Sequence, residues 1–169
     1  MTSPQRVAIA LGSNLGASFR ILEEALETLA ALDRAPGMGV RARSSWWRTR
    51  AVGPPQPDYL NGCALLDTSL SPEVLLERLQ DTERRFGRVR RERWGARTLD
   101  LDLIFFGDLR LESERLTLPH PRFRERAFVL LPLAEIAPEW RDPLTGRTVA
   151  ELARQAPDQD TARRLAVPS

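Results

Sequence analysis

The chain has 169 residues, of which 42% are hydrophobic and 28% charged, and its net charge is +2. These values suit one soluble globular domain over residues 1–169, and we expect it in the cytoplasm, since no apolar run approaches the roughly 18 residues of a membrane helix and no signal peptide is apparent. All 25 basic residues are arginines, which excludes a Walker A loop and a protein-kinase site because both need a lysine.

The first half of the chain predicts two strands and a helix. Residues 6–11 form an apolar strand that ends at a glycine-containing turn, and residues 18–32 place leucines on one face of a helix. Residues 40–49 alternate as a second strand. Prolines then make residues 50–58 a loop.

A third strand is predicted over residues 59–68, with Tyr59 and Asn61 on the face opposite to its apolar residues. Ser71, Pro72 and Glu73 form a helix start, and the helix is expected to end near Phe86.

The strongest strand pattern, TLDLDLIFF, covers residues 98–106. A helix over residues 125–135 and a capping box at residues 148–151 follow, and the last ten residues are expected to be loosely attached. The order βαββαβ predicts an α+β, ferredoxin-like antiparallel sheet with helices on its faces and a C-terminal extension.

Asp100 and Asp102 are the first candidates for chemistry. At positions i and i+2 of a strand their side chains point to one face, roughly 6–7 Å apart, while the leucines between them enter the core. Paired carboxylates suit Mg²⁺ bound together with substrate phosphates. They could equally be solvated acids on an exposed face, or partners of nearby arginines.

Residues 84–97 hold seven arginines and one acid, Glu92, directly before that strand. A loop of arginines over two carboxylates suits a polyanion with cations between them, such as ATP with magnesium. A surface ion-pair cluster or a nucleic-acid patch would show the same composition.

The single histidine and the single cysteine are weaker signals. His120 lies between two prolines and near arginines, which favours a phosphate or ribose contact over a general base. Cys63, among apolar strand residues, reads as a small core residue, and a lone cysteine excludes an internal disulfide.

Four sequence blocks together resemble the 6-hydroxymethyl-7,8-dihydropterin pyrophosphokinase family of folate biosynthesis. They are ALGSNLG (10–16), PDYLNGCALLDT (57–68), GRVRRERWGARTLDLDLIFFG (87–107) and LTLPHPRFRERAFVLLPLAEIAP (116–138). The resemblance implies an ATP- and magnesium-dependent diphosphotransferase that converts ATP and the hydroxymethyl-dihydropterin into AMP and the dihydropterin methyl diphosphate.

The resemblance also implies a role for each matching residue. Asp100 and Asp102 would hold two Mg²⁺ ions, and Arg88, Arg90 and Arg97 would bind the triphosphate and stabilise the charge in transfer. The ATP pocket would further be lined by Gln80, Glu83, Trp94, Leu103, Arg115, Thr117, His120 and Arg126. The pterin would be stacked by Tyr59 and Phe128, hydrogen-bonded at Asn61 and near Thr49 and Val52, and covered by Trp94. Gly12, Ser13 and Asn14 would form a turn at the pocket floor.

Two departures from the family pattern concern the loops. Arg50 replaces a proline that often follows the Arg-Thr dipeptide, and the loop of residues 87–94 is one residue shorter than usual, which leaves a role for Arg93 open.

Two other functions fit the same fold. Nucleotidyl transferases and cyclases also present a carboxylate pair on such a sheet, and an RNA-binding module would account for the arginines. We expect no nucleic acid as a partner, because outward-facing carboxylates would repel a phosphate backbone. We also expect no membrane partner, and a monomer.

Overall fold

The structure is a computed structural model that describes residues 4–14, 18–32, 35, 38–49, 58–87 and 99–165. The main strands are β1 (Gln5–Ser13), β2 (Gly39–Arg43), β3 (Trp47–Thr49), β4 (Tyr59–Thr68), β5 (Asp100–Phe106) and β8 (Ala162–Arg164). The helices are α1 (Ser18–Ala30), α2 (Pro72–Gly87), α3 (Ala127–Ile136) and α4 (Val149–Gln155). A small hairpin joins β6 (Leu111–Glu112) to β7 (Thr117–Leu118).

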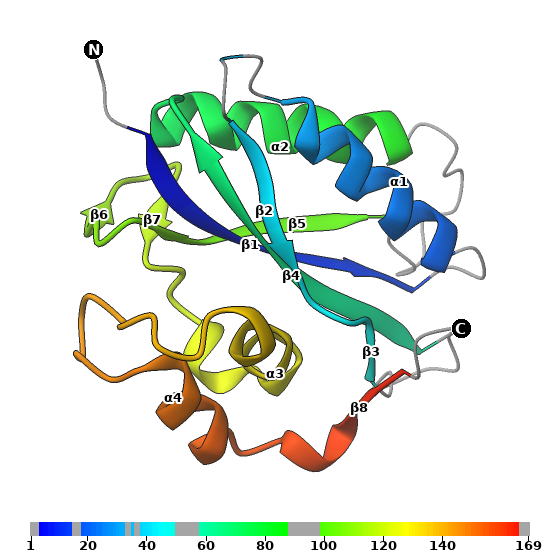
Figure 1. Ribbon diagram of the computed structural model, residues 1–169, viewed down its shortest axis with the longest axis vertical. Helices are drawn as coiled ribbons and strands as arrows, with labels where there is room; N and C mark the ends of the chain where they lie inside the picture. The colour runs from blue at the N-terminus through cyan, green and yellow to red at the C-terminus, as the bar shows by residue number, and fades with distance from the viewer. Residues whose placement is uncertain are drawn as a thin grey trace.

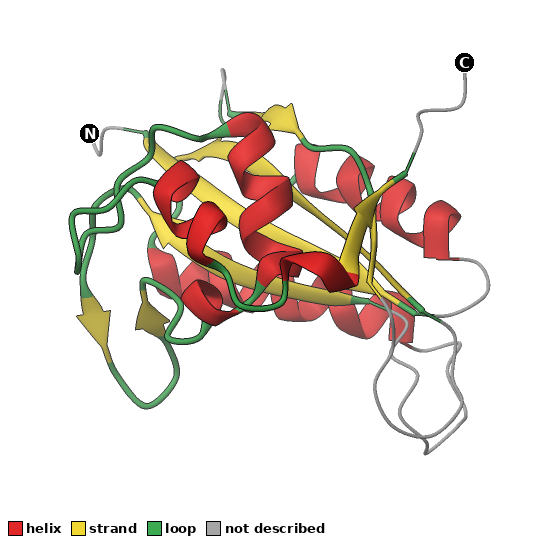
Figure 2. Ribbon diagram, turned by 90° about the horizontal axis from the view of Figure 1, so that it is seen from below, coloured by secondary structure: helices red, strands yellow, loops and turns green. Residues whose placement is uncertain are grey.

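The main sheet has the strand order β5-β1-β4-β3-β8, and β2 pairs with β4 beside β3. Every pairing in it is antiparallel. Helices α1 and α2 cover one face of this sheet, while α3 and α4 lie on the other (Figure 1). The predicted ferredoxin-like α+β fold is therefore confirmed, with helices on both faces (Figure 2).

Each face of the sheet has its own hydrophobic core, because neighbouring side chains on a strand point in opposite directions. Val7, Ile9 and Leu11 of β1 pack towards α1 and α2. Ala8 and Ala10 pack towards α3 and α4. Burying a leucine or isoleucine side chain in such a core contributes about 1.5–3 kcal/mol.

Two helix starts form as their sequence motifs predict. Ser71 Oγ accepts a hydrogen bond from Val74 N at 3.3 Å at the start of α2. Thr148 Oγ1 accepts one from Glu151 N at 3.2 Å before α4 and donates its own proton to Glu151 Oε1 at 3.2 Å, so the two predicted capping residues contact each other at the helix start.

The predicted strand over residues 40–49 is in fact two strands, β2 and β3. Between them Ser44 Oγ accepts a hydrogen bond from Cys63 N, and Trp46 turns into the core against Gly62. A β-carbon on Gly62 would lie 2.5 Å from the Trp46 ring, so only glycine admits the indole there. Tertiary packing thus breaks a pattern that alternates well by itself.

Two other predicted boundaries need correction. β1 extends through Ser13, so Gly12 and Ser13 are strand residues paired with β4 and not part of a turn. The predicted helix over residues 125–135 begins at Ala127, after a 3-10 turn at Phe123–Glu125.

The chain end is also better anchored than predicted. Ala162–Arg164 form β8 and pair with β3, and Leu165 N donates to Trp46 O. Among the described residues, no helix combines the length and the apolar character needed to cross a membrane.

Candidate active site

The two predicted aspartates lie on the sheet face that α3 covers. Asp102 pairs with Ala10 of β1, which belongs to the core on that side, whereas Leu101 belongs to the core on the other side. Asp100 pairs with Gly12, and both carboxylates are half-buried. The alternation of residues 100–103 therefore places both acids on one face, as their spacing predicts.

Gly12 separates the Asp100 side chain from that of Asn61. In the paired register, Asn61 of β4, Gly12 of β1 and Asp100 of β5 form one row across the sheet. A β-carbon on Gly12 would lie 2.8 Å from Asn61 Oδ1, so the absence of a side chain leaves room for the carboxamide. Asn61 is 6% exposed, and its Nδ2 donates to Thr49 Oγ1 at 3.1 Å.

Two groups from elsewhere in the chain bind the outer edge of β5. Glu83 Oε2 of α2 accepts a hydrogen bond from Leu101 N at 2.8 Å. His120 N donates to Ile104 O at 3.0 Å. These contacts bring Glu83 and His120 to the strand that carries the aspartates, and Gln80 lies one helical turn before Glu83 in α2.

His120 is held as a neutral imidazole. Burial lowers the pKa of His120, and the charges of Arg126 and Arg122 lower it further, although the Asp102 carboxylate opposes them. Its Nδ1 accepts a hydrogen bond from Arg122 N at 3.1 Å, which assigns the proton to Nε2. The Nε2–H group is thus a donor suited to a phosphate or hydroxyl oxygen near Asp102.

Arg126 and Phe128, expected to contact ATP and the pterin respectively, lie together at the start of α3. The Arg126 guanidinium carbon lies 5.5 Å from the centre of the Phe128 ring. This cation–π contact links the two expected subsites through neighbouring residues.

Not every predicted site residue meets the aspartates. The Leu103 side chain is buried in the core beneath α1 and α2, on the face away from the carboxylates, so only its backbone could line a pocket beside them. Arg115 is exposed, and its Nη1 lies 3.6 Å from Oε1 of Glu77 in α2. Thr117 is half-buried in β7.

Tyr59 is half-buried and pairs with Thr49, on the same face as Asn61.

Five predicted residues lie outside the described ranges: Val52, Arg88, Arg90, Trp94 and Arg97. Within those ranges, no group of three or more His, Cys, Asp or Glu side chains gathers as if around one metal ion. A pair of hard carboxylates nevertheless suits magnesium when phosphate oxygens complete its coordination.

Cys63 is buried, as predicted, and its Sγ lies 3.5 Å from Val129 O of α3. Burial raises the pKa of the Cys63 thiol, and the negative charge of Glu135 raises it further. The thiol is therefore protonated and acts as a small core group.

The sequence analysis did not predict the ion pair between Arg124, in the segment that carries His120 and Arg126, and Asp142. Arg124 Nε and Nη2 donate to the two oxygens of Asp142 at 2.5 and 2.8 Å. Burial alone would raise the pKa of Asp142, but these bonds, with donors from Leu144 and Thr145 and the charge of Arg124, bring it below its usual value. The Asp-Pro-Leu-Thr stretch at 142–145 is a turn signal that could have indicated an anchoring role.

Trp47, which is not among the predicted site residues, also binds α3. Its indole Nε1 donates to Glu135 Oε1 of α3 at 2.5 Å. A bond between residues this far apart in the chain has no local sequence signal.

Comparison of the sequence with known proteins identifies a family. The sequence model of the family "7,8-dihydro-6-hydroxymethylpterin-pyrophosphokinase (HPPK)" matches residues 8–138. A Synechocystis relative named 2-amino-4-hydroxy-6-hydroxymethyldihydropteridine pyrophosphokinase is 54% identical over 147 residues, which are 87% of this chain and 74% of the relative. A Pseudomonas aeruginosa relative of the same name is 44% identical over 160 residues, 94% and 96% of the two chains.

Solved structures of Plasmodium falciparum HPPK-DHPS share the fold. The wild-type protein with pterin and p-hydroxybenzoate superposes with a TM-score of 0.73 at 13% identity, covering 99% of this chain and 47% of that one. A triple mutant with STZ-DHP gives 0.74 at 12% identity. The present chain thus spans about half the length of the solved structures that it matches, and at this identity the likeness concerns the fold alone.

Proposed function

The chain belongs to the 7,8-dihydro-6-hydroxymethylpterin-pyrophosphokinase family, and we propose that it transfers a diphosphate group from ATP to 6-hydroxymethyl-7,8-dihydropterin in folate biosynthesis. The products are AMP and the dihydropterin methyl diphosphate. The observation that carries this proposal is the row formed by Asn61, Gly12 and Asp100. In this row the Asn61 carboxamide, a candidate hydrogen-bonding group for the pterin edge, and the Asp100 carboxylate, a candidate magnesium ligand, lie on either side of β1.

Asp100 and Asp102 are the proposed ligands of two magnesium ions that arrive with the ATP phosphates. Their carboxylates share one face of β5 and are half-buried. Carboxylate oxygens are ligands that magnesium prefers. When bound, the ions neutralise phosphate charge and align the reacting oxygens. We assign the remaining charge stabilisation to Arg88, Arg90 and Arg97.

The nucleotide lies, in this proposal, along the outer edge of β5. Glu83 and His120 already bind the backbone of that strand, and the His120 imidazole offers its Nε2–H group there. Arg126 adds a positive charge close to His120. Gln80, Arg115 and Thr117 complete the proposed nucleotide contacts, with Trp94 closing over the site and Leu103 contributing only its backbone.

The pterin lies on the sheet face between β3 and β1. Tyr59 and Phe128 supply flat surfaces, and Asn61 and Thr49, already joined by a hydrogen bond, supply donors and acceptors for the pterin edge. Matched hydrogen-bonding groups of this kind select strongly against substrates that lack the partner atoms. Val52 is the proposed further contact from the loop.

The reaction is an in-line displacement at the β-phosphorus. The hydroxymethyl oxygen of the pterin forms a bond to that phosphorus, the bond from the β-phosphorus to the oxygen bridging it to the α-phosphorus breaks, and AMP leaves with that oxygen. The hydroxyl proton passes to solvent, since we assign no side chain as general base. Positioning of the two substrates and stabilisation of charge then supply the catalysis.

The test is incubation of the purified protein with ATP and magnesium, with and without the pterin, followed by chromatography of the nucleotides. AMP formed only when the pterin is present supports the proposal. Release of pyrophosphate from ATP without pterin would instead identify a nucleotidyl transferase or cyclase.

We further propose that the protein acts as a cytoplasmic monomer on small molecules alone. The support is its single cysteine, which is buried, and the small set of large hydrophobic side chains exposed among the described residues, namely Phe19, Val74, Leu109 and Leu144. Light scattering should give a mass near 19.1 kDa, and a dimer mass would contradict the proposal.

A further inference from the structure

Strand β3 is a short strand that pairs with a neighbour on each side. It has three residues, Trp47–Thr49, and follows the irregular segment 44–46 that separates it from β2. It pairs with β4 on one side and with β8 on the other. These pairings fix β3 within the plane of the sheet, but they do not set its distance from the helix packed above that plane.

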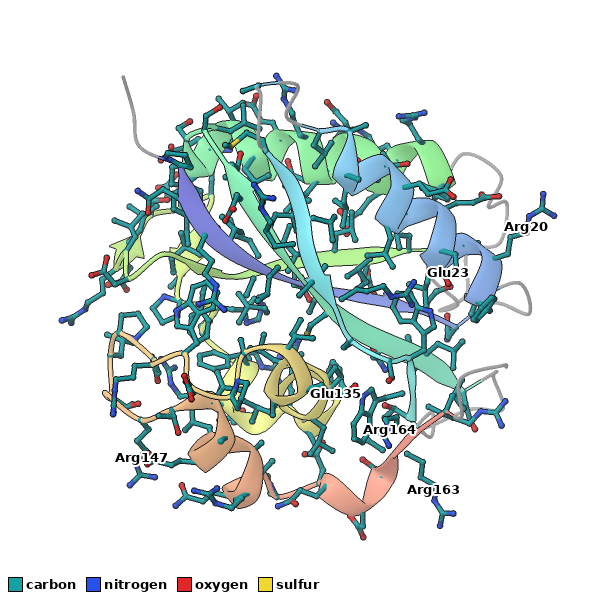
Figure 3. The ribbon with its side chains drawn as sticks, viewed as in Figure 1. Arg20, Glu23, Glu135, Arg147, Arg163 and Arg164 are labelled. Carbon is teal, nitrogen blue, oxygen red and sulfur yellow. The ribbon has the colours of Figure 1, made fainter. Side chains whose placement is uncertain are left out.

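A carboxylate on α3 provides that second restraint. Glu135 Oε1 accepts a hydrogen bond from Trp47 Nε1 at 2.5 Å. Glu135 Oε2 accepts two more, from Ser45 N at 3.3 Å and Ser45 Oγ at 3.0 Å. Figure 3 shows Glu135 at the part of α3 nearest β3. Hydrogen bonds to a charged acceptor are stronger than neutral ones, so these three form a firm link between helix and strand.

The restraint on Trp47 extends to Thr49 and Asn61. Trp47 and Thr49 are at positions i and i+2 of β3, so their side chains share one face, and Trp47 pairs directly with Asn61. Asn61 Nδ2 donates to Thr49 Oγ1 at 3.1 Å. A shift of β3 would therefore move the Thr49 hydroxyl and turn the Asn61 carboxamide.

The same helix carries Phe128 two turns before Glu135. Residues seven apart lie on the same side of a helix, so Glu135 and Phe128 both project from one side of α3. Tyr59, the other proposed stacking residue, pairs with Thr49 on the sheet. The bond between Glu135 and Trp47 thus joins the element that carries one aromatic ring to the strand beside the other.

We propose that Glu135 and Trp47 are positioning residues for the pterin, an inference that rests on the proposed function. Their hydrogen bond sets the separation between α3 and β3, and with it the gap between Phe128 and Tyr59 and the orientation of the Thr49–Asn61 pair. A flat ring held between two others needs a gap of roughly 7 Å, twice the carbon–carbon contact distance, so small changes in helix position cost stacking.

Glu135→Gln is the decisive variant, because glutamine keeps the size of the side chain but not both acceptors. If its Oε1 accepts from Trp47, its Nε2–H₂ group faces the Ser45 N–H donor. We expect KM for the pterin to rise about tenfold, the effect of losing one hydrogen bond to a charged group. KM for ATP should change less than about twofold, because the hydrogen bonds of Glu135 in the described part of the chain go to Ser45 and Trp47, which are not proposed nucleotide residues.

Trp47→Phe removes the indole donor and retains an aromatic ring, so it should raise KM for the pterin by about fivefold. In that background Glu135→Gln should add little, since glutamine Oε1 is then available to Ser45 N. This non-additivity is the signature of a direct link between the two side chains. Glu139→Gln is the matched control, because it removes a carboxylate from the exposed turn just after α3 and should leave both KM values unchanged.

The outcomes separate the inference from the proposed function. A wild-type protein that makes no pterin-dependent AMP overturns the function. An active wild type whose Glu135→Gln variant keeps its pterin KM, or raises both KM values equally, overturns the inference alone, as would additive effects in the double variant. Trp47→Phe carries the same test if Glu135→Gln does not fold, and an unchanged pterin KM there also overturns the inference.

Discussion

The two faces of the central sheet are built from the same strands but differ in chemistry. The face beneath α1 and α2 presents large apolar side chains, such as Ile9, Leu11 and Leu103, all 4% exposed or less. The face beneath α3 presents small residues along β1, namely Ala8, Ala10 and Gly12, and polar residues at the same end of the neighbouring strands. Both faces bury a hydrophobic core, but on the α3 side the small residues of β1 and the neighbouring polar residues leave an end of the sheet for the proposed substrates.

This difference explains how a single strand can serve both purposes. In β5 the side chains of Leu101 and Leu103 anchor the strand in the core, and the carboxylates of Asp100 and Asp102 point the other way. Substitutions of the β5 leucines should therefore change the free energy of unfolding, and substitutions of its two aspartates should change activity.

The largest expected effect is on the second face. Asp102→Ala removes a proposed magnesium ligand, so the rate should fall by about 10³-fold or more, equivalent to about 4 kcal/mol of transition-state stabilisation, with little change in Tm. Steady-state rates and a thermal melt measure both. Asp108→Ala, in the exposed turn after β5, is the control. A variant that kept more than about a tenth of the wild-type rate would remove the two-metal hypothesis.

Leu103→Ala tests the opposite face. Its side chain is 4% exposed in the core, so its truncation should lower the free energy of unfolding by about 2–5 kcal/mol. The specific activity of the folded fraction should stay near that of the wild type. Urea unfolding gives the stability, and Leu109→Ala, at an exposed leucine, should change it by less than about 1 kcal/mol. Lost activity without lost stability would mean that the Leu103 side chain reaches the substrates.

Gly12→Ala places a methyl group 2.8 Å from Asn61 Oδ1, a contact too short to persist. The Asn61 carboxamide must move, so KM for the pterin should rise about tenfold while KM for ATP changes little. Gly87→Ala is the matched glycine control, because its new β-carbon meets no described atom within 4 Å. Equal pterin KM values for Gly12→Ala and the wild type would show that the row across the sheet does not contact the pterin.

The smallest effect concerns a polar anchor on the α3 side. Asp142 has a pKa below the usual 3.8, so its ionised form stabilises the fold above pH 3.8 and that contribution is lost as pH falls through the folded pKa. Asp142→Asn should lower Tm at pH 7 and should flatten the fall in Tm below pH 4. Melts from pH 7 to pH 2.5 measure this, and parallel curves for both proteins would contradict the role of the Arg124–Asp142 pair.

Local patterns in the sequence were enough to predict much of the fold. The span of β4, the division of its residues between two faces and the shared face of Asp100 and Asp102 all follow from alternation, which any extended chain must obey. The starts of α2 and α4 follow from hydrogen bonds between residues three apart. The four motif blocks identified the family because they keep their order along the chain.

What depends on distant pairing was decided only by the tertiary structure. No local pattern reveals that Trp46 packs on Gly62 and splits a strand, that β8 joins β3, or that Glu135 binds Trp47 across 88 residues of chain. Such contacts form only when the two layers of helices close on the sheet, and their free energy comes from geometry that neither segment specifies alone. The sequence thus predicted which side chains carry the chemistry, and the packing of α3 against the sheet decided how those on the described strands and helix lie relative to one another.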